Sequence, residues 1–129
     1  MDPHPFRTAI ESKDMEEAFA LLGPDVVFRS PAVHAPYRGK AAVSHLLRHA
    51  GDVLEDLTYI DELRGERSVA LVFRARVGDK EVEGLDHLAL GEDGAITELR
   101  VMMRPLSGVI ALAQAMGARL EDDPVPPGT

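Results

Sequence analysis

Apolar and polar side chains alternate along residues 67–104, and two short turn sequences divide this stretch into three predicted strands. Gly78-Asp79 and Asp93-Gly94 are typical of tight β-hairpins, since the central residues of such turns adopt positive φ. We therefore expect a three-stranded antiparallel ribbon whose turns fix the strand register.

The register decides which side chains share a face, because successive residues of a strand point to opposite sides. We place Val77 opposite Lys80 in the first hairpin and Glu92 opposite Ala95 in the second. One face then pairs opposite charges, which supports the register: Arg76 with Glu81 and Arg74 with Glu83. The other face is mostly apolar and carries Leu71, Phe73, Ala75, Val77, Val82, Gly84, Asp86, Leu88, Leu90, Thr97, Leu99, Val101 and Met103.

Asp86 is the carboxylic acid on this apolar face. Burial disfavours the charged form of an acid, so an inward Asp86 should take up a proton or find a partner. Two interpretations stay open. Asp86 could serve a ligand as a neutral hydrogen-bond donor or general acid, or it could organise the core by bonding a buried tyrosine, a backbone group or water.

The rest of the chain predicts helices packed on this ribbon. Further elements are expected as follows: a short helix at Phe6–Ile10, a helix capped by Asp14 and running to Leu22, a strand over Val26–Arg29, a proline-constrained loop over Ser30–Gly39, a helix ending at Gly51, a strand over Val53–Leu63 and a last helix capped by Ser107. This order predicts an α+β fold, in which a curved antiparallel sheet carries helices on its concave face and leaves a cone-shaped pocket between the layers.

Length and composition narrow the function. We expect one domain over residues 1–120 and an acidic, proline-rich tail over 121–129 that is disordered. A net charge of -8 and a pI near 5.0 argue against nucleic acid or an anionic membrane surface as a partner. The absence of cysteine, of an apolar run of membrane-spanning length and of a signal peptide at Met1–His4 favours a cytoplasmic protein.

Four segments together resemble a known superfamily. They are KDMEEAFALLGPDVVFRSP, the approach Pro36-Tyr37-Arg38-Gly39, GLDHLAL and EDGAITELRV. In this order and spacing, residues 5–104 resemble the nuclear transport factor 2-like superfamily, and within it the SnoaL-like branch of polyketide cyclase and ketosteroid isomerase-like proteins. The resemblance implies a pocket within the cone and a homodimer formed through the outer face of the sheet.

The resemblance is less definite about chemistry. Ketosteroid isomerases use a tyrosine on the first helix, a carboxylate base and a protonated aspartic acid on a later strand. Asp86 matches the protonated acid, whereas Phe6 and Ser30 stand where the tyrosine and the base would be. Phenylalanine cannot donate a hydrogen bond, so the resemblance does not predict steroid isomerisation for this chain. Scytalone dehydratase and limonene epoxide hydrolase have the same fold with other residues, so the fold does not select a reaction.

The remaining candidates surround Asp86 in the predicted fold. His34 lies in the proline-constrained loop and is either a general base at the pocket mouth or an exposed loop residue. Tyr37 either lends its hydroxyl to the pocket or packs the loop. The other side chains that we expect to contact a ligand are Phe6, Phe28, Ser30, Phe73, Leu88, Leu99, Val101 and Met103.

Three further polar residues receive other roles. His45 and His49 are four residues apart, a spacing that can hold a metal, but no carboxylate accompanies them in the sequence. We therefore expect a solvated helix face and no metal site. His87 follows Asp86 and should face outward, where a dimer contact is the simplest role.

The sequence thus supports two functions. The first is a cofactor-free acid–base enzyme, an isomerase, cyclase or dehydratase that binds a small hydrophobic molecule containing oxygen, with Asp86 as acid and His34 as base. The second is a non-catalytic ligand-binding or dimeric assembly module of the same fold.

Overall fold

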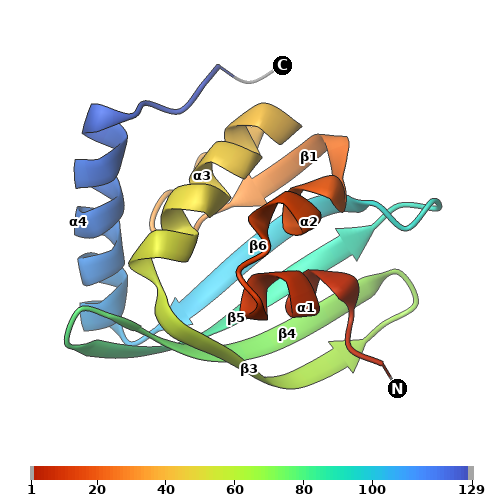
Figure 1. The fold of residues 1–129 in the computed structure, drawn as a ribbon, viewed down its shortest axis with the longest axis horizontal. Helices are drawn as coiled ribbons and strands as arrows, with labels where there is room; N and C mark the ends of the chain where they lie inside the picture. The colour runs from red at the N-terminus through yellow and green to blue at the C-terminus, as the bar shows by residue number, and fades with distance from the viewer. Residues whose placement is uncertain (1, 128–129) are drawn as a thin grey trace.

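A computed structural model describes residues 2–127 as one curved sheet with four helices (Figure 1). The helices are α1 (Pro5–Glu11), α2 (Met15–Ala20), α3 (Lys40–Val53) and α4 (Leu106–Asp122). The strands are β1 (Leu22–Arg29), β2 (Tyr37–Arg38), β3 (Glu55–Arg64), β4 (Ser68–Val77), β5 (Lys80–Leu90) and β6 (Ile96–Arg104). The predicted α+β class is confirmed.

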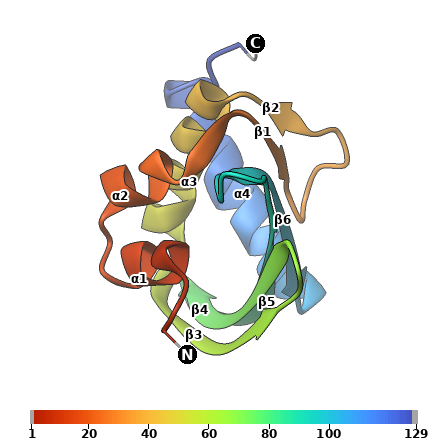
Figure 2. The ribbon, with the colours of Figure 1, turned by 90° about the vertical axis from the view of Figure 1, so that its right-hand side faces the viewer.

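The sheet has the strand order β2-β1-β6-β5-β4-β3 and curls around the helices (Figures 1 and 2). Its strands pair antiparallel, as expected, except that β1 runs parallel to β6. A parallel pair needs a long crossover connection, and α3 together with β3, β4 and β5 supplies it. The sheet is therefore mixed, which the local pattern of the ribbon could not indicate.

The first hairpin has the predicted register. Val77 pairs with Lys80 across the Gly78-Asp79 turn, and Gly78 adopts φ 60°. The expected charge pairs, Arg76 with Glu81 and Arg74 with Glu83, lie directly opposite each other. Alternation then brings the apolar side chains of β4 and β5 to the inner face, where Leu71 and Phe73 are buried.

The second hairpin departs from the prediction near its turn. Five residues, Gly91 to Ala95, connect the strands, and the register shifts between Ala89 and Leu90. This bulge turns Ile96 inward, fully buried, and leaves Thr97 exposed, so the predicted inward position of Thr97 is wrong. Beyond the bulge the predicted register returns, with Asp86 opposite Val101.

The helices differ from the prediction mainly at their ends. Asp14 caps α2 by accepting a hydrogen bond from the Glu17 amide, as predicted, but the helix ends at Ala20 and β1 already begins at Leu22. The Ser107 cap is wrong, because Pro105 occupies the N-cap position of α4.

The observed bounds of the loop, the third strand and the tail also differ from the predicted bounds. Within the predicted loop, Tyr37 and Arg38 form the short β2 against β1. The strand expected over Val53–Leu63 runs from Glu55 to Arg64, because α3 continues to Val53. The tail expected over 121–129 begins later, since α4 continues to Asp122 and Val125 packs on the core. Residues 128–129 lie outside the described residues.

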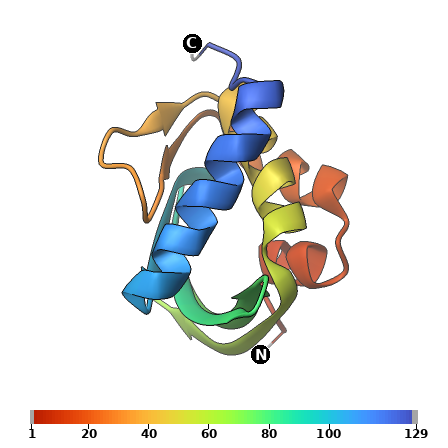
Figure 3. The same cartoon turned by 90° about the vertical axis from the view of Figure 1, so that its left-hand side faces the viewer.

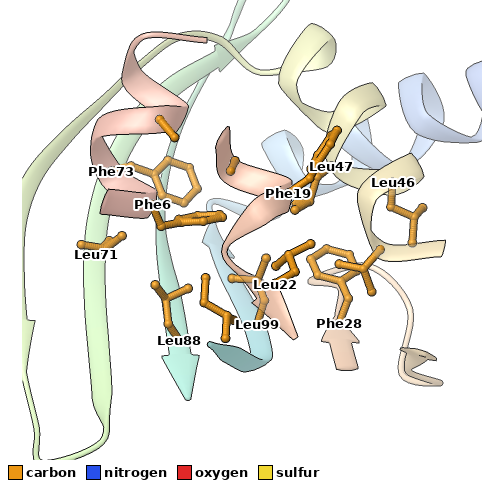
Figure 4. Packing of buried hydrophobic residues seen from close by; sticks show 14 of the residues in the cluster. Phe6, Phe19, Leu22, Phe28, Leu46, Leu47, Leu71, Phe73, Leu88 and Leu99 are labelled. Atoms are coloured by element: carbon orange, nitrogen blue, oxygen red, sulfur yellow. The ribbon is translucent and has the colours of Figure 1, made fainter. Parts of the chain in front are cut away.

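A continuous apolar core joins the helices to the concave face of the sheet (Figure 4). Phe6 of α1 lies above Leu71 and Leu88, and its helix is capped by His4, whose Nδ1 accepts a hydrogen bond from the Phe6 amide at 3.1 Å. None of the helices in residues 2–127 combines the length and the hydrophobicity that crossing a membrane requires.

Candidate active site

A cavity of about 1030 Å³ lies between the concave face of the sheet and the helices. Its lining is mostly apolar and comes from both layers: Phe6, Ile10, Phe28, Tyr37, Leu46, Leu47, Phe73, Leu99, Val101, Met103, Leu112, Met116 and Leu120. Exposed Lys13 and Asp56 also border it, so the cavity reaches solvent. Helix α4 passes across the open side of the curled sheet (Figure 3). A volume of this size is sufficient for a small organic molecule.

Asp86 contributes a carboxyl group to this apolar cavity. It is 8% exposed, and the hydroxyl of Tyr59 on β3 donates a hydrogen bond to its Oδ2 at 2.6 Å. Tyr59 is the only hydrogen-bond partner of the Asp86 side chain within residues 2–127. The second carboxyl oxygen therefore remains available to a ligand.

Helix α1 holds Tyr59 in place. The Tyr59 amide donates to Glu11 Oε2 at 3.0 Å, and Arg7 donates to the Tyr59 carbonyl oxygen at 3.2 Å. The Tyr59 ring packs edge-on against Phe73, with their centroids 6.1 Å apart. Phe73 in turn lies over Gly84, where a Cβ atom would come within 2.2 Å of the Phe73 ring. Gly84 lies two residues before Asp86 on β5. The Tyr59 ring and the Phe73 ring beside it are thus held in place by packing close to Asp86.

Burial raises the pKa of Asp86 to about 6, because the apolar surroundings disfavour its charged form, and the hydrogen bond from Tyr59 opposes this shift. Burial also raises the pKa of Tyr59 well above its ordinary value, with the nearby Asp86 adding to the effect. Tyr59 therefore stays a donor, while Asp86 can exchange a proton close to neutral pH. A group with these properties in a cavity can act as a general acid or a general base.

The structure brings most of the predicted ligand-contacting residues together. Those that line the cavity with Asp86 are Phe6, Phe28, Ser30, Tyr37, Phe73, Leu99, Val101 and Met103. His34 is exposed in the loop and does not line the cavity, so the structure does not bring it to Asp86 as the expected base. Leu88 points inward as expected, but it is packed in the core beside Leu99 and beneath Phe6 (Figure 4).

Tyr59, the hydrogen-bond partner of Asp86, was not among the predicted site residues. The alternation of β3 is broken by register irregularities on both sides of Tyr59, between Glu55 and Thr58 and between Tyr59 and Asp61. A signal was nevertheless present: an inward acid requires a donor, and Tyr59 is one of two tyrosines in the chain.

The other histidines lie outside the cavity. His87 is on the outer face of the sheet, where its Nδ1 is buried without a hydrogen-bond partner within the described chain. His45 and His49 are not on a solvated face, since their side chains are only 19% and 12% exposed, and both contact Asp123 beyond the end of α4.

Comparison with known proteins agrees with this architecture. Residues 5–99 match the family model of the SnoaL-like domain. None of the curated proteins compared with the chain matches it. The crystal structure of a steroid delta-isomerase from Pseudomonas aeruginosa is 43% identical, with a TM-score of 0.85 over 89% of this chain and 85% of that chain.

A second structure extends the likeness to proteins without an assigned activity. An uncharacterised bacterial protein with a cystatin-like fold from Silicibacter pomeroyi is 32% identical, with a TM-score of 0.88 over 92% of this chain and 84% of that chain. The extent of the family match and the identity of these relatives exceed what a shared fold alone would require. The chain therefore belongs to the SnoaL-like branch of the nuclear transport factor 2-like superfamily.

Proposed function

We propose that the protein binds a small hydrophobic molecule containing a carbonyl or hydroxyl oxygen and catalyses a cofactor-free isomerisation, cyclisation or dehydration next to that oxygen. The observation that carries this proposal is the Asp86 carboxyl group, bonded to Tyr59 and placed in an apolar cavity with its pKa raised to about 6. We also propose that the protein is cytoplasmic, since a chain without cysteine suits a reducing compartment.

Asp86 performs the proton transfer in this proposal. At pH 7 about nine in ten copies of a group with this pKa are ionised, and the carboxylate can remove a proton from a carbon next to a carbonyl. The resulting acid can return the proton to another atom of the same molecule. A bound apolar ligand excludes water from the cavity and strengthens each of these interactions.

Tyr59 supports both forms of Asp86. Its hydroxyl donates to Oδ2 and so fixes the orientation of the carboxyl group, which leaves the other oxygen for the ligand. The chain lacks the tyrosine and the base of ketosteroid isomerases at Phe6 and Ser30. Tyr59 supplies a phenol to the same cavity from strand β3. Asp86 both takes and returns the proton in this proposal, so no separate base is required.

The experiment follows the conversion of a cyclic β,γ-unsaturated ketone to its conjugated isomer by ultraviolet absorbance, together with the binding of a naphthol to the cavity. Asp86→Asn should lower kcat at least about a hundredfold and remove the dependence of the rate on ionisation near pH 6, because the amide cannot exchange the proton. Asp79→Asn, in the exposed β4–β5 turn, should leave the rate unchanged and serves as the matched control. Equal turnover and equal naphthol binding by the wild-type protein and Asp86→Asn would refute the proposal.

A non-catalytic dimeric module remains the second candidate, and the outer face of the sheet favours it. Val72, Leu85 and Met102 form an apolar row across three strands, and Met102 is 53% exposed. We propose that a second copy of the chain covers this row. Sedimentation should show a dimer that Met102→Glu dissociates; naphthol binding without any isomerisation would favour this candidate over the enzyme.

A further inference from the structure

We propose that His45, His49 and Asp123 form a site for a divalent transition-metal ion of the zinc class, which fastens the end of α4 to α3. The three residues each direct a ligand atom to one place, and these atoms all lie within 4.8 Å of one another. The site is separate from the Asp86 cavity chemistry and does not depend on the proposed function.

The geometry of the histidine pair comes from α3. Residues four apart lie one above the other on a helix, and the two rings are in edge contact with centroids 4.9 Å apart. The Nε2 atom of His45 lies 2.8 Å from the Asp123 carbonyl oxygen and 3.6 Å from its Oδ2, and the Nε2 atom of His49 lies 2.8 Å from the same Oδ2. Both Nε2 atoms therefore converge on one carboxylate.

Asp123 is the ligand that the sequence could not supply. It lies 74 residues after His49 and directly beyond α4, so the pairing of α3 with α4 brings it to the histidines. Two imidazoles and one carboxylate are a ligand set that zinc accepts, with water or the Asp123 carbonyl oxygen to complete four-coordination. The low exposure of both histidine side chains, 19% and 12%, limits competition from solvent.

Arg119 acts on the site through His49. Its Nε donates to His49 Nδ1 at 2.9 Å, so in the metal-free protein the proton of this neutral imidazole is on Nε2. A metal at Nε2 moves that proton to Nδ1, and Arg119 must then release His49. Arg119 keeps a partner when it releases His49, because its Nη2 atom donates a hydrogen bond to Asp52 Oδ2 at 2.5 Å.

This competition yields a sharp comparison between variants. The new amide oxygen of an Arg119→Gln variant can accept a hydrogen bond from Nδ1–H, so we expect this variant to bind zinc about tenfold or more tightly than the wild type. Asp123→Asn keeps an oxygen acceptor for His49 but loses the negative charge. We expect it to keep the stability of the metal-free protein while zinc affinity falls.

The test is calorimetric titration of the untagged full chain with Zn²⁺, with Co²⁺ absorption as a second readout of tetrahedral coordination. The wild type should bind one Zn²⁺ per chain and should not bind Mg²⁺, which prefers oxygen ligands. His45→Ala and His49→Ala should each weaken binding by more than about tenfold, since the loss of a residue that only supports a metal ligand already costs that much. His34→Ala, in the exposed loop, is the control and should bind as the wild type does.

Two results would overturn the proposal. One is equal zinc affinity in the wild type and the His45→Ala, His49→Ala double variant, which would place the ion elsewhere. The other is zinc binding by Arg119→Gln alone, which would make the wild-type cluster a hydrogen-bonded contact between α3 and α4 and no metal site.

Discussion

Asp86 and Asp56 are the same side chain in two environments on the lining of one cavity. Asp86 is buried and bonded to a neutral phenol, so burial raises its pKa to about 6. Asp56 is exposed and paired with Arg76, whose hydrogen bond and positive charge lower the pKa of Asp56. A phenol does not compensate the lost hydration of a carboxylate, whereas a guanidinium in solvent stabilises the charge without that loss.

The two environments give the two carboxylates different chemical roles. Asp86 can change its protonation state near neutral pH and therefore can take part in proton transfer. Asp56 stays ionised through the same range, so at the rim of the cavity it can act only as a constant negative charge. The position of a carboxylate around a pocket thus matters less than the partner and the solvent around it.

The largest expected effect comes from Asp86→Asn measured as a function of pH. The folded-state pKa of Asp86 is raised above its ordinary value of 3.8, so its contribution to stability is fully present below pH 3.8 and is lost as the pH rises to about 6. Above pH 6 the buried charge costs about 3 kcal/mol. Asparagine removes this charge, so the variant should be more stable than the wild type by up to that amount at pH 8.

Urea unfolding of both proteins between pH 4 and pH 8 measures this difference, and contributions from other groups cancel in it. Asp86→Ala is the companion variant: it removes the charge but leaves the Tyr59 hydroxyl without an acceptor, so it should gain less. A difference between wild type and Asp86→Asn that does not change with pH would show that the carboxyl group is hydrated in solution.

Tyr59→Phe should give the next largest effect. The hydrogen bond from Tyr59 favours the charged form of Asp86, so its removal should raise the pKa of Asp86 above about 6. At pH 8 the variant should lose about 1.5–3 kcal/mol, because the bond is to a charged group. Carbon-13 NMR titration of the Asp86 carboxyl group measures the shift directly.

The Asp86→Asn background provides the control for this prediction. There the same tyrosine donates to a neutral amide, and Tyr59→Phe should cost only about 0.5–1.5 kcal/mol. An equal loss in both backgrounds would mean that the hydroxyl contributes through packing and not through its bond to the charged carboxylate.

The inward position of Asp86 could be predicted from the sequence, because the alternation of side chains between the two faces of a strand is a local property. The Gly78-Asp79 turn fixes the register of β4 and β5, and each inward position then follows by counting. The same count fails at Thr97, since the bulge near Leu90 changes the parity and nothing in the local pattern marks it. The fold class was also predictable, because local patterns indicate the helices and strands and their order. The parallel pairing of β1 with β6 was not, because it depends on contacts between distant segments.

The contacts of the candidate site residues were harder to predict. Tyr59 reaches Asp86 from a strand whose alternation is irregular, and Asp123 reaches His49 from the far end of the chain. The place of His34 depends on the path of a proline-constrained loop, which turns it to solvent. Side chains on regular strands could be assigned to a face, but contacts between distant elements required the packed structure.

Asp56→Asn should have the smallest effect and the opposite dependence on pH. The folded-state pKa of Asp56 is lowered, so its stabilising contribution is present above its ordinary pKa and is lost as the pH falls through the lowered value. Asp56 has φ 53°, a left-handed conformation that asparagine also adopts readily, so the substitution changes the charge without adding backbone strain. At pH 7 the variant should therefore be slightly less stable than the wild type. Salt near 1 M should erase this difference because the pair with Arg76 is exposed, while the gain of Asp86→Asn should persist. Urea unfolding of the wild type, Asp56→Asn and Asp86→Asn at low and high salt makes the comparison. If salt also erased the stability gain of Asp86→Asn, the Asp86 carboxylate would be exposed to solvent as Asp56 is.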